Sequence, residues 1–534
     1  MTGVVALTGS FTAPQIDWAH LSPILIVLGA GVVGVLVEAF VPRTARRAVQ
    51  LALALAATAG AVVAVAALWS GVRDSGGTVV LGGSVLIDGP GLIIQGIVAA
   101  MTLLALLVVA DRTETREDAF APAASAVPGS DYEEQTRRLG LVQTEVYPLI
   151  LFAAGGMMIF PAAGDLLTMF VALEVLSLPL YLLSGLARRR RLLSQEAAMK
   201  YFLLGAFASA IFLFGVALLY GFAGSVRLDA IAAATTTTLG MDGLLLAGIA
   251  MVLVGLLFKI GAVPFHSWTP DVYQGAPTPI TGFMAACTKA AAFGALLRVV
   301  YVIVPALRWD LLPALWAIVI ITMAVGSVVA LVQTDVKRIL AYSAIAHTGF
   351  ILTGVVALDQ SGITAVMFYL IAYSLATIGA FAVITLVREV GPDGEVLGEA
   401  THLSQWAGLG KRSPWLAAAF ALFLLSFAGI PLTAGFIAKF TAFSAAVAGG
   451  ATALAVVGVV ASAVSLFFYV RIIVLMFFTD ASDPGEHGAA VVTVVRSEGF
   501  TAVAIAVAAA ATLVLGVFPS GTLDLMSQAA RFIP

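Results

Sequence analysis

Five ionisable side chains lie inside long apolar stretches of this sequence. They are Glu174, Lys200, Lys259, Lys289 and Lys439. A charge at the centre of a bilayer costs about 2.5–3.5 kcal/mol on a permissive scale, so five charges exposed to lipid would cost roughly 12–17 kcal/mol, comparable with the net stability of a whole protein. We therefore expect these side chains to face a protein interior or a hydrated channel. A structural ion pair between helices would explain one such residue equally well, but five of them favour a transport role.

Lysine in an apolar environment is suited to carrying a proton. Removal from water favours the neutral amine, whereas a nearby carboxylate favours the ammonium form. Two charges about 8 Å apart interact by roughly 2 kcal/mol at an effective dielectric constant of about 20. Moving one proton against about 100 mV costs about 2.3 kcal/mol. Coupling between neighbouring sites is therefore large enough to help drive a proton across a membrane.

The composition places the chain in a membrane. Of its 534 residues, 61% are hydrophobic and 11% are charged, and the mean hydropathy is +1.06. A soluble domain could not cover its surface with polar groups from such a composition. The net charge of -3 gives no reason to expect a nucleic-acid partner. The single cysteine, Cys287, excludes an internal disulfide and an iron–sulfur cluster held by this chain alone.

Apolar stretches long enough to cross a hydrocarbon core of about 30 Å recur along the whole chain. They predict an all-α polytopic membrane protein with about fourteen transmembrane helices. We divide the chain into residues 1–145 with three helices and a loop, 146–305 and 306–480 with five helices each, and 481–534 with a loop and the last helix. The predicted spans are 21–40, 48–69, 91–110, 147–162, 166–187, 196–222, 243–275, 279–304, 311–332, 338–358, 362–387, 415–447, 451–478 and 499–518.

Every second loop is basic, beginning with the loop after the first predicted helix. Such loops face the cytoplasm in membrane proteins, which would leave both termini on the outer side. The polar stretch 111–145 is predicted to be a solvated linker, with docking of a neighbouring subunit as the alternative, and loops 391–413 and 479–496 are interpreted as similar linkers. The basic loops contain Arg43, Arg46 and Arg47; Arg112, Arg116, Arg137 and Arg138; Arg188 to Arg191; Lys337 and Arg338; and Lys411 and Arg412.

Two predicted spans, the seventh and the twelfth, contain helix-breaking residues close to a lysine. Pro264 follows Lys259 in GLLFKIGAVPFHSWTPDVYQGAPTP, and Gly429 and Pro431 precede Lys439 in LLSFAGIPLTAGFIAKFTAF. Proline removes a backbone donor and clashes with the preceding turn, so each helix should break there. Paired interruptions in corresponding positions are typical of transporter sites built on inverted repeats. Because these two fall five spans apart, we predict two inverted five-helix repeats; unrelated proline kinks are the alternative.

Two further residues have open interpretations. His347 lies in the middle of a predicted span; a lone buried histidine is usually only hydrogen-bonded, but here it could bridge Lys289 and Lys439. Glu196 lies four residues before Lys200 on the same helical face, so a local ion pair explains Lys200 as well as a relay does.

Six segments of the sequence together resemble one known family. Over roughly residues 145–480 the chain resembles subunit N of the bacterial NADH–quinone oxidoreductase, respiratory complex I. The DVYQGAP string, and a lysine where the sister subunit M has a glutamate, favour N over the related subunits L and M. Loop 111–145 departs from what the family pattern explains. The segments are LEVLSLPLYLL around Glu174, EAAMKYFLLGAFAS around Lys200, FKIGAVPFHSWTPDVYQGAPTPITGF around Lys259, CTKAAAFG around Lys289, TDVKRILAYSAIAHTGF around His347 and GIPLTAGFIAKF around Lys439.

The resemblance implies a fold and a proton-translocating function. It implies an antiporter-like fold with two inverted five-helix repeats, in a multi-pass subunit of the plasma membrane that lies beside other membrane subunits of the complex. In this interpretation Glu174 and Lys259 form a coupled pair, and Lys289 relays the proton laterally. His347 then passes it toward Lys439 on the exit side. Lys200 corresponds to a family lysine on the sixth helix and is counted among the relay residues.

The sequence predicts no cofactor in this chain. It contains no nucleotide-binding glycine fingerprint and no metal-ligand cluster, so NADH, FMN, iron–sulfur clusters and quinone would be used by other subunits. Two alternatives remain open. One is a cation/proton antiporter subunit of the Mrp type, and the other is a structural scaffold whose buried charges are static pairs.

Overall fold

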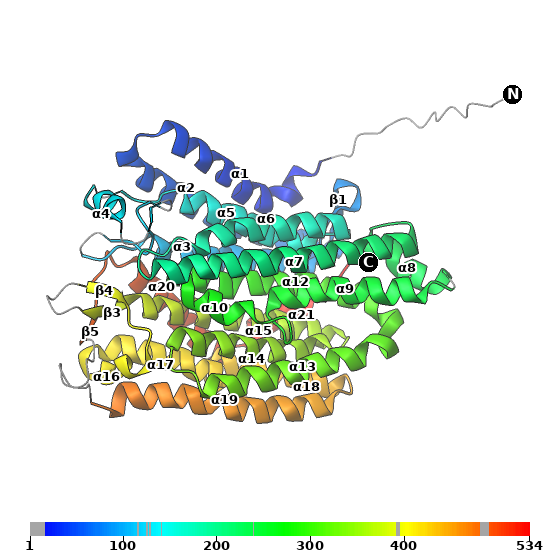
Figure 1. Cartoon of the computed structure of the whole chain (residues 1–534). Helices are drawn as coiled ribbons and strands as arrows, with labels where there is room; N and C mark the ends of the chain where they lie inside the picture. The colour runs from blue at the N-terminus through cyan, green and yellow to red at the C-terminus, as the bar shows by residue number, and fades with distance from the viewer. Residues whose placement is uncertain are drawn as a thin grey trace.

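In the computed structural model the chain forms one bundle of helices that run side by side (Figure 1). The structure describes residues 16–114, 117–123, 126–127, 130–139, 141–238, 240–390, 396–480 and 491–533. Within these residues, eleven helices are long and apolar enough to cross a membrane, and three shorter apolar helices accompany them: Val146–Ala162, Pro414–Ala428 and Ala434–Ala448. The prediction of an all-α membrane protein is confirmed, while the exact number of crossings stays a prediction.

The N-terminal part contains three long helices and a short β-hairpin. Strands β1 and β2 pair antiparallel, with Thr78 opposite Ile87. Three-residue strands are too short to give a recognisable alternation in sequence, and the hairpin was not predicted. The elements are α1 (Trp18–Phe40), α2 (Arg43–Ser75), β1 (Thr78–Val80), η1 (Leu81–Gly83), β2 (Val85–Ile87), α3 (Gly89–Ala110) and the surface helix α4 (Asp131–Arg138).

The next part of the bundle extends from α5 to residue 307. Its helices pack mainly on their neighbours, α5 on α6, α6 on α7 and α7 on α9. A π-helical turn, Met284–Thr288, separates α11 from α12. The elements are α5 (Val146–Ile159), η2 (Phe160–Ala162), α6 (Leu166–Ser184), α7 (Arg191–Ala223), α8 (Leu228–Thr237), α9 (Asp242–Ile260), α10 (Trp268–Gly275), α11 (Thr278–Phe283), α12 (Lys289–Ile303) and η4 (Val304–Leu307).

The remaining described part of the chain extends from α13 to the C-terminal segment. A three-stranded antiparallel sheet in the order β4-β3-β5 joins two of its loops. The elements are α13 (Arg308–Leu331), α14 (Val336–Val355), α15 (Gln360–Leu386), β3 (Val387–Val390), β4 (Val396–Glu399), η5 (Leu403–Trp406), α16 (Leu409–Arg412), α17 (Pro414–Ala428), α18 (Ala434–Ala448), α19 (Thr452–Phe478), β5 (Val491–Val494), α20 (Phe500–Val517) and α21 (Ser520–Ala529).

Helix α15 occupies the centre of the bundle. Its most apolar window is 94% buried, whereas that of α2 is only 22% buried. It packs against α20, α18, α11, α17, α14 and α3. A helix that is apolar on every side belongs in such a position, because no face has to meet water or a charged group. The predicted ionisable site residues lie on the helices around α15, and α15 itself contributes uncharged groups such as the Tyr369 hydroxyl.

Two helices end at a glycine close to the proline residues of the seventh and twelfth predicted spans, and the first ends before Pro264 rather than at it. Helix α9 ends at Gly261, whose φ of 73° is left-handed, and the next helix begins at Trp268. Helix α17 ends at Gly429 with a φ of 83°, and α18 begins at Ala434. Glycine adopts this conformation without the steric cost that a side chain would add. Each interruption exposes backbone carbonyl groups at a helix end inside the bundle.

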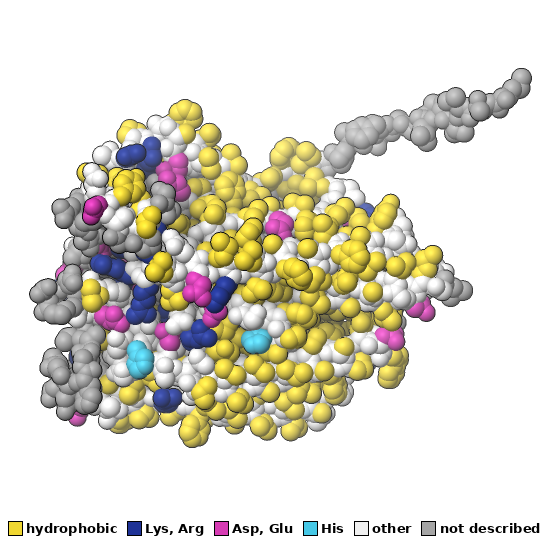
Figure 2. All heavy atoms as spheres, in the orientation of Figure 1, with side chains coloured by type: hydrophobic (Ala, Val, Ile, Leu, Met, Phe, Trp, Pro, Cys, Tyr) yellow, Lys and Arg dark blue, Asp and Glu magenta, His cyan; other side chains and the backbone are white. Residues whose placement is uncertain are grey.

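The two ends of the bundle differ in charge. The end that carries β3, β4 and β5 gathers many of the Lys and Arg side chains in Figure 2, beside a broad apolar surface over the helices; we call it the basic end. The opposite end carries the β1–β2 hairpin, against which the start of α1 packs through Leu21. We call it the hairpin end. The C-terminal segment also lies there, because the Ile533 N–H donates to Asp88 beside the hairpin.

The expectation that three loops are simple solvated linkers is wrong for part of each loop. In stretch 111–145, Phe120 and Ala121 are buried. Parts of loops 391–413 and 479–496 form strands β4 and β5, with β3 between the two. The apolar runs that pack here are short, such as Val491–Val494 in β5, and lie within stretches that are polar as a whole.

Candidate functional site

Lys259 lies in the last turn of α9 and is buried. Its Nζ donates to Ser177 Oγ at 2.7 Å and to Tyr201 Oη at 3.2 Å. The same Nζ lies 5.2 Å from the ring centroid of Tyr201 and 5.8 Å from that of Tyr181, so cation–π attraction adds to the hydrogen bonds. The ammonium group is thus held by hydroxyls and aromatic faces from α6 and α7.

Glu174 lies on α6, one turn before Ser177, and is partly buried. Among the described residues it forms no ion pair with Lys259, and its Oε1 atom is buried without a hydrogen-bond partner. Ser177, which binds Lys259, lies three residues after Glu174 on α6. The predicted pair lies on two different helices, α6 and α9, and does not form an ion pair among the described residues.

Lys289 begins α12 directly after the π-helical turn and is buried. Its Nζ donates to the carbonyl of Ala344 at 2.5 Å and to Thr348 Oγ1 at 2.8 Å. The Thr348 hydroxyl also lies 2.8 Å from the carbonyl oxygen of Ile260, the residue after Lys259. This carbonyl is available because α9 ends there. Thr348, which sequence reasoning missed, thus connects Lys289 to the end of the helix that carries Lys259.

His347 lies on α14 between two phenol groups. Its Nδ1 is 2.8 Å from Tyr369 Oη and its Nε2 is 3.3 Å from Tyr469 Oη. Tyr469 also pairs with the hydroxyl of Ser343, one turn earlier on α14. The histidine therefore has a hydrogen-bond partner on each nitrogen, and both partners are hydroxyls rather than lysines.

Lys439 lies on α18 and points back at the end of α17. Its Nζ donates to the carbonyl of Ala428 at 3.0 Å and to Ser462 Oγ at 2.7 Å. It also lies 4.7 Å from the ring centroid of Phe350. The helix interruption supplies the carbonyl, and the C-terminal end of a helix attracts a cation through its partial negative charge.

Lys200 has different surroundings from the other three lysines. Its side chain is 42% exposed and pairs with Glu196 at 2.6 Å and Asp271 at 2.7 Å. Arg338 pairs with the other oxygen of Asp271 at 2.9 Å. These contacts fit the local ion pair that the sequence left open, and they lie outside the buried set.

A fully buried ion pair was missed by sequence reasoning. The two terminal nitrogens of the Arg298 guanidinium donate to Asp88, at 2.8 and 2.9 Å, and its Nε donates to the carbonyl of Pro161 at 2.6 Å. The ring of Phe532 covers the guanidinium at 5.0 Å. The sequence could have indicated this ion pair, because Arg298 is a charged residue inside a predicted span. Its contacts join α3, η2, α12 and the C-terminal segment at the hairpin end.

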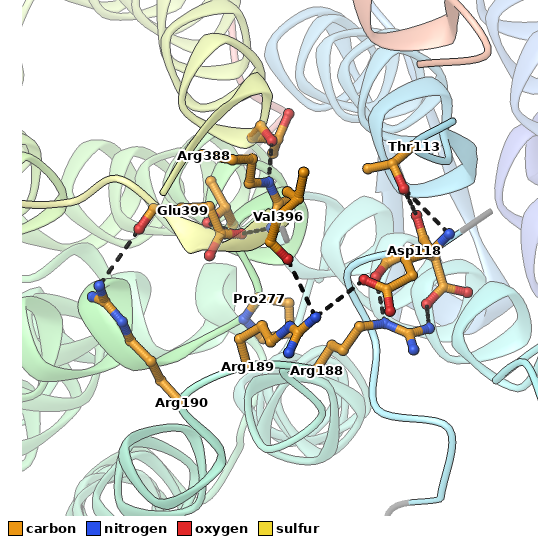
Figure 3. Close-up of polar contacts among 12 residues, drawn as sticks. Thr113, Asp118, Arg188, Arg189, Arg190, Pro277, Arg388, Val396 and Glu399 are labelled. Carbon is orange, nitrogen blue, oxygen red and sulfur yellow. Dashed lines mark hydrogen bonds and ion pairs between the residues drawn. The ribbon is translucent and has the colours of Figure 1, made fainter. Parts of the chain in front are cut away.

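A second network of ion pairs and hydrogen bonds lies at the basic end (Figure 3). Arg188 pairs with Asp118 at 2.6 Å, and Arg190 donates to Thr401 Oγ1 at 2.7 Å. Figure 3 also shows Arg189 directed at Val396, whose carbonyl it contacts at 3.4 Å. The run of arginines therefore ties the stretch after α3 to the strand β4.

Glu399 is the carboxylate at the inner side of this network. It lies 3.7 Å from Arg388 and accepts from Thr278 Oγ1 at 3.1 Å. Thr278 in turn accepts from Lys337 Nζ at 3.2 Å. Burial alone would raise the pKa of Glu399, but the charges of Arg388 and Lys337 and the bond from Thr278 outweigh it and lower the pKa to about 2. Glu399 is therefore a permanent anion that joins strand β4 to α11 and α14.

Lys259, Lys289 and Lys439 share one kind of environment, and a fourth buried lysine, Lys337 at the basic end, also binds a carbonyl and a hydroxyl. Each ammonium group binds hydroxyl or carbonyl oxygens, and none has a carboxylate within ion-pair distance among the described residues. An ammonium without a counterion is costly in an apolar interior, whereas a neutral amine is tolerated there. Such groups can bind and release a proton. No group of three His, Cys, Asp or Glu side chains in the described part of the chain could hold a metal ion.

The chain is similar to known membrane proteins. The family described as NADH:quinone oxidoreductase/Mrp antiporter, TM, matches residues 163–465. The NADH-quinone oxidoreductase subunit N of Beutenbergia cavernae is 65% identical over 531 residues, which is 98% of this chain and 100% of the relative. The subunit N of Mycobacterium tuberculosis is 54% identical over 98% of this chain and 99% of its own length.

Solved structures have the same fold. A chain of respiratory complex I from Thermus thermophilus with bound Aureothin is 32% identical, with a TM-score of 0.74, and the match covers 95% of this chain and 100% of the other. A chain of the Mrp complex from Dietzia sp. is 24% identical, with a TM-score of 0.75 over 95% of this chain and 97% of the other, which shows the common fold alone. The antiporter-like fold is thus confirmed, and the chain belongs to the NADH:quinone oxidoreductase/Mrp antiporter family, among the N subunits of NADH-quinone oxidoreductase.

Proposed function

We propose that this chain translocates protons through a relay in the order Glu174, Lys259, Lys289, His347 and Lys439, coupled to electron transfer from NADH to quinone elsewhere in the complex. The observation that carries the proposal is the environment of the three lysines, which are buried and bind hydroxyls and carbonyls in place of carboxylates. Static ion pairs would place a carboxylate beside each of them. Lys200, paired with two carboxylates at the surface, is assigned a supporting electrostatic role.

Helix ends and hydroxyls support the first half of the relay. Ser177, three residues after Glu174 on α6, binds Lys259, and Thr348 joins Lys289 to the carbonyl end of α9. A change in the charge of Glu174 would alter how strongly Lys259 holds its proton. Protonation of one site therefore influences the next.

The redox chemistry belongs to other subunits. NADH, FMN, iron–sulfur clusters and quinone would be bound there, and this chain would bind none of them. Its partners are the neighbouring membrane subunits of the complex and the lipid of the bacterial plasma membrane. The basic end would face the cytoplasm and the hairpin end the outside, so that both termini lie on the outer side. The two five-helix units, residues 146–305 and 306–480, would each provide one half of the relay.

Substitution of Lys259 or Glu174 tests the proposal. We expect Lys259→Ala and Glu174→Ala to lower proton pumping and coupled quinone reduction by roughly tenfold or more, while the complex still assembles. Pumping is measured as acidification of inverted membrane vesicles on addition of NADH, and assembly as NADH oxidation by an artificial acceptor. Full pumping in both variants would refute the relay. Purification separates the alternative of an Mrp-type antiporter subunit, because only a complex I subunit would co-purify with flavin and iron–sulfur proteins.

A further inference from the structure

Helix α19 carries a stripe of hydroxyl groups on an otherwise apolar helix. Ser462, Ser465 and Tyr469 are spaced by three and four residues, which places them on one helical face. Ser465 and Tyr469 are at most 1% exposed. Nothing in the proposed relay uses this helix.

The two ends of the stripe touch the two last members of the relay. Ser462 Oγ is 2.7 Å from the Nζ of Lys439. Tyr469 Oη is 3.3 Å from Nε2 of His347. Between them, Ser465 Oγ lies 2.9 Å from Ser327 Oγ on α13. The stripe therefore extends from His347 to Lys439 and has a polar partner at every step.

One aromatic ring, that of Phe350, lies against both His347 and Lys439. Phe350 packs edge-on against the His347 ring at 5.6 Å, and the Nζ of Lys439 lies 4.7 Å from the centroid of the same phenylalanine. Phe427 packs against His347 from another side at 5.4 Å. A phenyl ring neither donates nor accepts a proton, so a proton that leaves His347 for Lys439 requires another path.

We propose that protons pass between His347 and Lys439 along the α19 hydroxyl stripe, through Tyr469, Ser465 with Ser327, and Ser462. This inference rests on the proposed function and adds residues to it. In each step a hydroxyl oxygen accepts a proton on one side and releases its own proton on the other, so that the hydroxyl is unchanged when the proton has passed. Successive members are one turn apart, a rise of about 4.5–6 Å, which one hydrogen-bonded water can bridge.

Removal of single hydroxyls tests the stripe. Tyr469→Phe keeps the ring and its packing, and Ser465→Ala and Ser462→Ala remove only an oxygen atom. In the assembled complex we expect each to lower NADH-driven proton pumping by roughly tenfold. Ser465→Thr and Ser462→Thr retain a hydroxyl and should restore pumping to within about twofold of the unmodified complex. Tyr220→Phe is the matched control, because this tyrosine is 56% exposed on α7.

The outcomes separate the stripe from the relay itself. If Lys259→Ala and Lys439→Met reduce pumping but Tyr469→Phe and Ser465→Ala leave it unchanged, the stripe is wrong and the relay stands. If the lysine variants leave pumping unchanged, the proposed function fails. If one variant does not assemble, the variant of the neighbouring residue on the stripe is measured instead. Loss of assembly in all three hydroxyl variants, or threonine variants as slow as the alanine ones, would mean that the stripe only holds the helices together, and would overturn the inference.

Discussion

Single residues in this chain hold buried ammonium groups without a fixed counter-charge. Lys439 binds the carbonyl of Ala428 at the end of α17, and Thr348 connects Lys289 to the carbonyl of Ile260 at the end of α9. A helix C-terminus carries a partial negative charge of about half an elementary charge. Such a charge stabilises an ammonium group less than a carboxylate would, so the lysine can still lose its proton. The interrupted helices therefore matter for electrostatics as much as for shape.

Gly429 gives a direct test of this role. A Cβ atom built at Gly429 would lie 2.9 Å from Cδ of Lys439, at a φ of 83° that already disfavours a side chain. Gly429→Ala should therefore displace Lys439 from the carbonyl of Ala428 and lower proton pumping by roughly tenfold. Gly450→Ala is the control, because Gly450 has the same φ of 83° but open space around its Cβ position. Equal pumping by the two variants would show that the glycine serves only the backbone turn.

Among the elements, the helices at the hairpin end depend on one ion pair. Asp88 caps the start of α3 through the Gly91 N–H and binds Arg298 of α12, and both side chains are completely buried. Residue Ile533 also donates to Asp88. Removing one partner of such a pair leaves a buried charge uncompensated. The pair therefore holds the two helices and the C-terminal segment together.

Replacement of Arg298 should destabilise the protein strongly. We expect Arg298→Met to reduce the free energy of unfolding by about 3–5 kcal/mol, seen as a lower melting temperature of the purified complex. The exposed pair of Arg227 and Asp229 is the matched control, since an exposed pair contributes only about 0–1 kcal/mol. Arg227→Met should therefore change the melting temperature little. If both variants melt alike, the buried pair does not have this role.

At the scale of helices and strands, the long helices could be predicted from the sequence, but the contacts between them could not. Apolar length and glycine or proline placed α9, α17 and their interruptions, because these features are local. The lysines stood out because each is a charge in an apolar stretch. The sequence did not single out Tyr469, Ser465 or Thr348, since a hydroxyl barely changes the hydropathy of a helix. Their importance comes from packing against residues more than 80 positions away, which no local pattern reports.

On the scale of the whole molecule, the network at the basic end ties the two halves of the bundle together. Glu399 follows α15 in the second half, and its hydrogen bond to Thr278 reaches the first half. Arg188 and Arg190 extend the network to the stretch after α3 and to Thr401. The network thus fixes the position of α11, which leads through the π-helical turn to Lys289.

The lowered pKa of Glu399 predicts how stability depends on pH. Its pKa is about 2 in the folded protein, against an ordinary value of 4.5. The carboxylate therefore stabilises the fold above about pH 4.5, and this contribution, about 3 kcal/mol at most, is lost as the pH falls from roughly 4.5 toward 2. Glu399→Gln should lower the melting temperature of the purified complex at neutral pH. The gap to the unmodified complex should narrow below about pH 4.5; a gap that is constant with pH would contradict the role of the charge.

The direction of proton transport depends on which end of the molecule faces the cytoplasm. The single cysteine, Cys287, is buried, so an introduced surface cysteine can be labelled against a low background. Thr236→Cys places a thiol on α8 at the hairpin end, and Ser404→Cys places one in η5 at the basic end, both at exposed positions. Because basic loops stay in the cytoplasm, a membrane-impermeant maleimide should label the Thr236→Cys protein in intact cells and the Ser404→Cys protein only in inverted vesicles. The reverse pattern would place the basic end outside. The exit-side role assigned to Lys439 would then have to be abandoned, because the direction of the relay is defined by which end faces the cytoplasm.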